Sequence, residues 1–92
     1  MRLAARVDAT QKEIVSALRK AGYRVLHLHT LGRGVPDLLI GSPHVRRMWL
    51  LECKVKGGTL TPDQVVFHDE WRGLVHVVKT AQEALRVVMG HP

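Results

Sequence analysis

The fold is decided by the stretch Met48-Trp49-Leu50-Leu51-Glu52-Cys53-Lys54-Val55, an apolar run that ends in a charged pair. A run of this kind is typical of a β-strand, in which side chains alternate between the two faces. Glu52 and Lys54 therefore lie on the same face, and Cys53 lies on the other. A charged pair at the end of an apolar strand is costly to bury unless it is paired or binds a metal ion. The stretch therefore predicts a strand with a polar site at its end.

A second acid stands before a second apolar run. Asp37 follows Gly34-Val35-Pro36 and opens Leu38-Leu39-Ile40, which predicts a neighbouring strand. Two carboxylates and a lysine that meet at one edge of a sheet suggest divalent-metal chemistry on a phosphodiester. In isolation, however, Asp37 could simply start a turn, and Glu52 and Lys54 could form an ion pair that contributes little to stability.

The composition limits the classes of protein and of partner. A chain of 92 residues that is 46% hydrophobic has material for one modest core, so we expect a single domain over residues 1–92. The net charge of +6 favours a polyanionic partner, although many small proteins are simply basic. Because only 4% of the residues are aromatic, we expect contacts to backbone phosphates rather than base stacking.

The sequence contains no sign of a membrane or secretory protein. It has no apolar run of roughly 18 residues, and its first residues lack the apolar block of a signal peptide. The single cysteine, Cys53, excludes an internal disulfide and fits a reducing compartment. We therefore expect a cytoplasmic protein without a membrane partner or a small-molecule cofactor.

The remaining elements follow from helix and turn signals. Thr61-Pro62-Asp63-Gln64 is a strong helix start, with Thr as the N-cap, Pro at the first position and Gln at the third. Ile14, Leu18 and Ala21 recur at helical spacing and predict the buried face of a first helix. We expect helices over 9–21, 61–72 and 80–90, and strands over 23–29, 37–40, 47–55 and 76–79. The predicted fold is α/β, with the order αβββαβα.

Three motifs in this order resemble a known family. Gly34-Val35-Pro36-Asp37-Leu38, Leu51-Glu52-Cys53-Lys54 and Leu60-Thr61-Pro62-Asp63-Gln64 together resemble the stand-alone virus-type replication-repair nuclease (VRR-Nuc) domain of the PD-(D/E)xK nuclease superfamily. The resemblance covers nearly the whole chain. It implies a restriction-endonuclease-like core, a small mixed sheet flanked by helices. It also implies an Mg²⁺- or Mn²⁺-dependent endonuclease that cuts DNA, selectively at branched structures such as Holliday junctions, and a homodimer.

The resemblance also implies roles for individual residues. Asp37 and Glu52 would bind the metal ion, with the carbonyl oxygen of Cys53 as a further ligand. Lys54 would position or deprotonate the attacking water, or stabilise the transition state, and the sequence does not separate these roles. Gln64 would lie near the active site, although a capping box with its N-cap residue accounts for it equally well.

The first helix departs from the pattern of related nucleases, which often place a further acid there. The candidates are Asp8, Gln11 and Glu13. Gln11 follows the apolar side of the predicted helix, and Asp8 lies one turn earlier on that side, so we favour Gln11 and then Asp8. Glu13 stands three residues after Thr10, where a capping box explains it. One-metal and two-metal sites both remain open.

Four cations in loops and at strand starts are candidates for contacts to nucleic acid, although solvated charge is the default for each: Arg33, Lys56, Arg46 and Arg47. His27 and His29 are expected on one strand face, as residues that flank the site or, less simply, contact DNA or metal. Val66 and Phe67 exceed what one small core needs and are candidates for a dimer interface.

Two other functions remain open. A non-catalytic nucleic-acid-binding subunit could keep the nuclease fold, but it would not need Asp37, Glu52 and Lys54 together. A basic adaptor protein would bind neither metal nor DNA in a salt-sensitive way.

Overall fold

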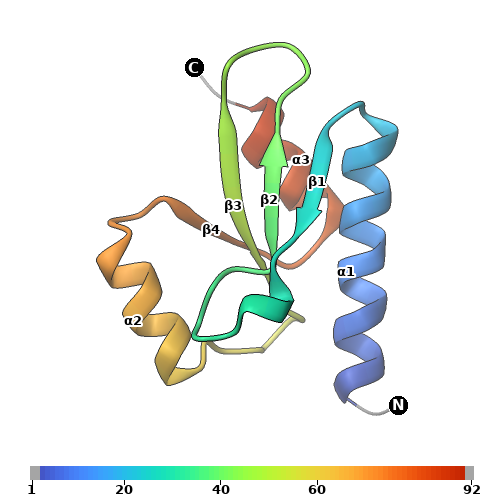
Figure 1. Ribbon diagram of the computed structural model, residues 1–92. Helices are drawn as coiled ribbons and strands as arrows, with labels where there is room; N and C mark the ends of the chain where they lie inside the picture. The colour runs from blue at the N-terminus through green and yellow to red at the C-terminus, as the bar shows by residue number, and fades with distance from the viewer. Residues whose placement is uncertain (1–2, 91–92) are drawn as a thin grey trace.

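The strands of the protein form one mixed sheet, as a computed structural model that describes residues 3–90 shows (Figure 1). The sheet has the order β1 (Arg24–His27), β2 (Leu38–Gly41), β3 (Met48–Cys53) and β4 (Val75–Val78). Strand β2 runs antiparallel to both β1 and β3, and β4 runs parallel to β3. A parallel neighbour requires a crossover connection, which α2 (Pro62–Glu70) supplies.

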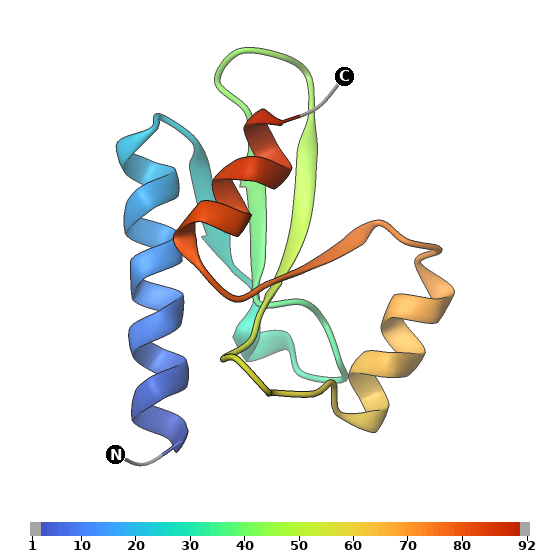
Figure 2. The ribbon, with the colours of Figure 1, turned by 180° about the vertical axis from the view of Figure 1, so that it is seen from behind.

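Helices α1 (Leu3–Lys20) and α3 (Ala81–Met89) contact each other and the sheet, and α3 crosses the face seen in Figure 2. Helix α2 lies apart from them in both views. The predicted αβββαβα order and the small mixed sheet flanked by helices are confirmed. No helix within residues 3–90 is long and apolar enough to cross a membrane.

The core lies between α1, α3 and one face of the sheet. Ile14 and Leu18 of α1 are fully buried, as predicted, whereas Ala21 is exposed because the helix ends at Lys20. The sheet and α3 supply further fully or nearly fully buried side chains: Leu38, Ile40, Leu51, Val78, Ala84 and Val88. Burial of each large aliphatic side chain contributes about 1.5–3 kcal/mol, so this cluster holds the sheet against both helices.

Several predicted bounds were wrong. Helix α1 begins at Leu3 rather than at residue 9, because the preceding residues are good helix formers without a stop signal. Thr10 therefore lies inside the helix, and no capping box explains Glu13. Helix α2 ends at Glu70, and Arg72 takes a left-handed φ of 51°. The 3₁₀ turn η1 (His29–Leu31) replaces the end of the predicted strand.

The two other central strands also end earlier or later than predicted. Strand β2 runs from Leu38 to Gly41 rather than over 37–40, so Asp37 directly precedes it. Strand β3 stops at Cys53 rather than at residue 55. Lys54 nevertheless stays aligned with β4, because its backbone N–H donates to the carbonyl of Val78 at 3.0 Å. The two acids therefore stand at the ends of paired strands, where the sheet gives way to loops.

Candidate active site

Strand pairing brings Asp37 and Glu52 together. Leu38 pairs with Leu51, so the next pair of this antiparallel ladder joins the two acids. The backbone N–H of Cys53 donates to Asp37 Oδ2 at 2.8 Å, which ties the first carboxylate to the end of β3. Opposite residues of an antiparallel pair project to the same face of the sheet. The carboxylates predicted from separate motifs therefore form one cluster.

Glu52 is the buried polar residue of this cluster, and its side chain is 1% exposed. Gln64 Nε2 donates to Glu52 Oε2 at 3.2 Å. Glu52 Oε1 lies 4.0 Å from His68 Nε2, and neither of these two buried atoms has a hydrogen-bond partner within residues 3–90. A buried carboxylate oxygen without a partner is costly and points to a missing ligand.

The surroundings of Glu52 oppose its ionisation. Its pKa is raised from 4.5 to about 8, first by burial and then by a hydrogen bond with Asp37 and the negative charge of that residue, while Lys54 acts to lower it. Burial also raises the pKa of the Cys53 thiol to about 12, so this thiol is a core side chain rather than a nucleophile. The pKa of His68 is lowered, first by burial and then by Lys54, which favours the neutral imidazole.

These residues fit a hard divalent cation. Within residues 3–90, no group of three or more His, Cys, Asp or Glu side chains is arranged to hold a metal ion. The site instead offers two carboxylates, one of which has an unpaired buried oxygen, and a cation would relieve both the repulsion and the missing contact. Mg²⁺ commonly binds through one or two carboxylates and keeps several waters. The part of the Cys53 carbonyl as a third ligand stays a prediction.

Gln64 serves the helix and the site at once. Its backbone N–H donates to Thr61 Oγ1 at 3.3 Å, and its Oε1 accepts from the Thr61 N–H at 2.9 Å. The capping box is thus confirmed, and the amide nitrogen remains directed at Glu52. The two interpretations of Gln64 from the sequence are therefore compatible, because the two ends of one amide contact different partners.

His68 is the site residue that sequence reasoning missed. It lies on α2 four residues after Gln64, so the two side chains project from the same face of the helix. The spacing of four residues between Gln64 and His68 could have indicated that both face the site, but the capping box involves only the first turn of the helix. Contact of this face with the end of β3 is a tertiary feature.

Gly34 allows α2 to approach the site. It has a φ of +77°, and a Cβ at this position would overlap the carbonyl of Asp63 and lie 2.8 Å from the backbone nitrogen of Gln64. Because these neighbours are backbone atoms, they cannot move without shifting the first turn of α2. The loop before Asp37 and the helix that carries Gln64 are therefore packed at a distance that only glycine permits.

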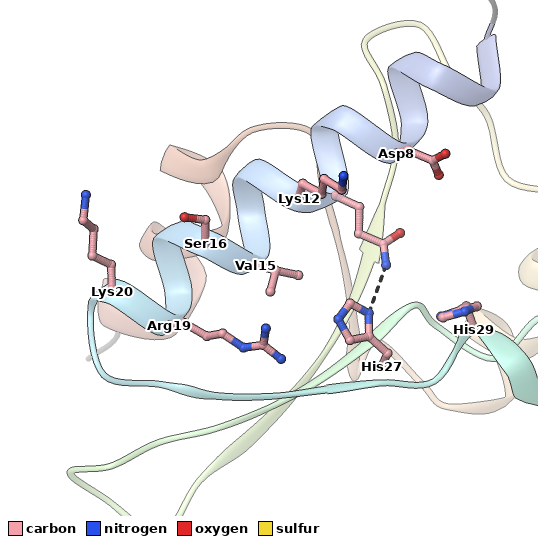
Figure 3. Close-up of a pocket in the computed structure, with 9 residues that line it drawn as sticks. Asp8, Lys12, Val15, Ser16, Arg19, Lys20, His27 and His29 are labelled. Carbon is pink, nitrogen blue, oxygen red and sulfur yellow. Dashed lines mark hydrogen bonds between the residues drawn. The ribbon is translucent and has the colours of Figure 1, made fainter.

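The other predicted site residues are more widely spread. Gln11 Nε2 lies 3.4 Å from His27 Nδ1, in a groove between α1 and β1 (Figure 3), and its part in the active site stays a prediction. Arg33 and Lys56 are exposed in the loops that precede Asp37 and follow Lys54. Arg46 and Arg47 belong to the turn between β2 and β3, at the opposite end of these strands from Glu52. The Arg47 guanidinium lies 5.5 Å from the Trp49 ring centroid.

Comparisons with known proteins agree with this fold. No protein-family model matches the chain. It is 38% identical over 74 residues to the protein named "Putative nuclease p44" of Acyrthosiphon pisum secondary endosymbiont phage 1, covering 79% of this chain and 78% of that protein. A solved structure described as "VRR_NUC domain" matches with a TM-score of 0.74 at 24% identity, over 95% of this chain and 98% of that one. The chain belongs to the VRR-Nuc family.

Proposed function

We propose that this protein is an endonuclease that hydrolyses phosphodiester bonds in DNA with the help of Mg²⁺ or Mn²⁺. The observation that carries the proposal is the buried, unpaired Oε1 of Glu52 beside the carboxylate of Asp37. These two side chains and the Cys53 carbonyl would hold the cation. When bound, such an ion neutralises charge on a phosphate and makes water a better nucleophile.

Lys54 supplies the positive charge of the site. Its ammonium lowers the pKa of Glu52 and that of His68, so it acts on both sides of the acid cluster. From this position it would bind a non-bridging phosphate oxygen or hold the attacking water by a hydrogen bond. Its charge would then stabilise the additional negative charge that develops in the transition state.

Gln64 and His68 would hold Glu52 in place. Gln64 donates to one carboxylate oxygen, and His68 Nε2 faces the other at 4.0 Å. A neutral imidazole with its proton on Nε2 would donate to Oε1 or to a water between them. We propose that both are positioning residues, since partners of this kind orient the groups that bind a metal ion.

The test is cleavage of plasmid and linear DNA in Mg²⁺, Mn²⁺ and EDTA. Asp37→Asn and Lys54→Ala should each abolish cutting, whereas Arg86→Ala, on the far helix α3, should not. Asparagine keeps an acceptor for the Cys53 N–H, so loss of activity in this variant is a loss of charge rather than of folding. Full activity of Lys54→Ala, or wild-type cutting in EDTA, would contradict the proposal. Metal-independent DNA binding without any cleavage would favour the non-catalytic subunit.

We further propose a homodimer that acts on branched DNA. One row of the sheet, Leu26-Leu39-Leu50-Val75, lies on the face opposite the core, and Leu26 is 57% exposed there. Val66 of α2 is 55% exposed, and Phe67 stacks on Trp71 with ring centroids 5.0 Å apart. Apolar side chains grouped on an exposed face are typical of interaction sites.

A two-fold dimer would set two active sites at a fixed separation, which suits a two-fold junction. Light scattering at micromolar concentration, with cleavage of a four-way junction and a linear duplex of equal length, tests both parts. A monomer that cuts both substrates equally well would refute the dimer and the branch selectivity, and would leave the metal-dependent chemistry intact.

A further inference from the structure

A hollow lies on the core side of the sheet, between α1 and the edge strand β1, and most of its lining residues have polar or charged side chains. This α1–β1 groove has a volume of about 990 Å³, and Figure 3 shows its lining side chains. Lys12, Arg19 and Lys20 line it with positive charge, and Asp8 is the acid among its lining residues. In the close-up, Arg19 extends from α1 toward β1. The Gln11 amide nitrogen lies 3.4 Å from His27 Nδ1.

The groove is joined to the acid cluster through the backbone. The N–H of Leu28 donates to the carbonyl of Asp37 at 2.8 Å. The two neighbours of Leu28, His27 and His29, line the groove, and their rings meet edge to face with centroids 5.9 Å apart. One end of the groove therefore lies at the end of the sheet where Asp37 stands, and the carboxylates of Asp37 and Glu52 project from the other face of that end.

We infer that the α1–β1 groove binds the phosphodiester backbone of the nucleic acid whose scissile phosphate lies at Asp37 and Glu52. The inference rests on the proposed function for the identity of the substrate. The inference assigns to α1 a role in binding the nucleic-acid strand. The resemblance had instead led us to expect that this helix contributes a further catalytic residue.

The donors of the groove suit phosphate oxygens. Arg19 Nη2 donates to the carbonyl of Val25 at 3.5 Å, which anchors the guanidinium across the groove and leaves its other N–H groups to bind an anion. Lys12 adds an exposed positive charge, and the Gln11 amide adds a neutral donor. Because aromatic planes are limited to two histidine rings, the groove is built for backbone contacts rather than for reading bases.

The experiment measures binding without cleavage. A fluorescein-labelled DNA duplex and the same single strand are titrated in EDTA, by anisotropy, from 50 to 300 mM KCl. The variants are Arg19→Gln, Lys12→Gln and the double substitution. Arg86→Gln is the matched control, because it removes the same charge from an exposed arginine of α3, the other helix on this side of the sheet.

Removal of one cation that binds a phosphate should lower the slope of log K against log salt by about 0.9 for duplex, or roughly eightfold in affinity at 0.1 M salt. The double variant should therefore bind roughly 60-fold more weakly, and the control should bind nearly as the wild type does. Thermal unfolding verifies folding. If Arg19→Gln is destabilised, Lys12→Gln decides alone, since Lys12 is exposed and lies in the middle of the helix.

The outcomes separate this inference from the nuclease proposal. Groove variants that bind DNA as the control does overturn the inference, even if the wild type cuts DNA. Groove variants that lose binding support it, even if no protein cuts DNA. In an active nuclease, the expected effect is a raised KM with unchanged kcat, and a fall in kcat alone would overturn the assignment to binding. Polyglutamate, a polyanion without phosphate groups, is titrated in the same way. Groove variants that lose binding to polyglutamate and keep unchanged binding to DNA would also overturn the inference.

Discussion

Replacing Glu52 with glutamine should stabilise the metal-free protein, although it removes a proposed metal ligand. The pKa of Glu52 is raised from 4.5 to about 8, mainly by burial, so the folded state keeps a proton that the unfolded chain releases at lower pH. The stability linked to this proton is complete below pH 4.5 and is lost as the pH rises toward 8.

The size of the effect follows from the same values. At pH 7, which is about 2.5 pH units above 4.5, the buried Glu52 makes the protein about 3 kcal/mol less stable than the same protein would be with a neutral side chain at this position. A glutamine amide resembles the protonated carboxyl. It keeps an acceptor for Gln64 Nε2 and a donor toward Asp37, and it does not titrate. Glu52→Gln should therefore raise the free energy of unfolding by up to about 3 kcal/mol at pH 7 and by little at pH 4.5.

The assay is urea unfolding of both proteins in EDTA at several pH values between 4.5 and 8.5. The difference between the two curves isolates Glu52, because other titrating groups such as His68 are common to both. Added Mn²⁺ should then raise the Tm of the wild type more at pH 8 than at pH 5, and should leave Glu52→Gln unchanged. A stability difference that is independent of pH, or a Glu52→Gln protein that responds to Mn²⁺ as the wild type does, would refute the reasoning.

Three further changes test the residues around Glu52, and two more test the loop before Asp37. Gln64→Ala should lower cleavage roughly 10- to 100-fold, the usual effect of losing a partner that orients a metal ligand, while removal of the cap costs only about 1 kcal/mol in unfolding experiments. His68→Gln keeps a nitrogen donor near the Nε2 position and should retain most activity and Mn²⁺ affinity, whereas His68→Leu should lose both. If calorimetry gives the two variants equal Mn²⁺ affinity, His68 is not part of the site. Gly34→Ala should lower stability by at least about 1–2 kcal/mol from its positive φ alone and should reduce cleavage further by displacing α2, which a normal Tm together with normal turnover would contradict. Arg33 has a left-handed φ of 56°, which glycine adopts without strain, so Arg33→Gly should not lower the Tm. If Arg33 contacts a phosphate, this variant should bind DNA more weakly, and unchanged affinity would exclude that role.

Much of the fold was predictable from local signals. Alternation along residues 48–55, the helix cap at Thr61 and the helical spacing of Ile14 and Leu18 predicted the type of these elements, because each depends on neighbours within a few residues. Bounds were less accurate where no local signal marks them. No capping residue in the sequence marks the start of α1, and the end of β1 depends on its pairing with β2. The single domain over residues 1–92 stays a prediction.

The sequence by itself determined that Asp37, Glu52 and Lys54 stand at the ends of two strands, since the spacing of the motifs and the period of a strand are properties of the chain. Only the tertiary structure decided that Glu52 is almost fully buried with one unpaired oxygen, and that Gln64 and His68 face it from α2. It also decided that Gly34 must be glycine, because another backbone passes there. The physical reason is that burial, pKa and the approach of one element to another depend on contacts between residues distant in sequence, which no local pattern of the chain encodes.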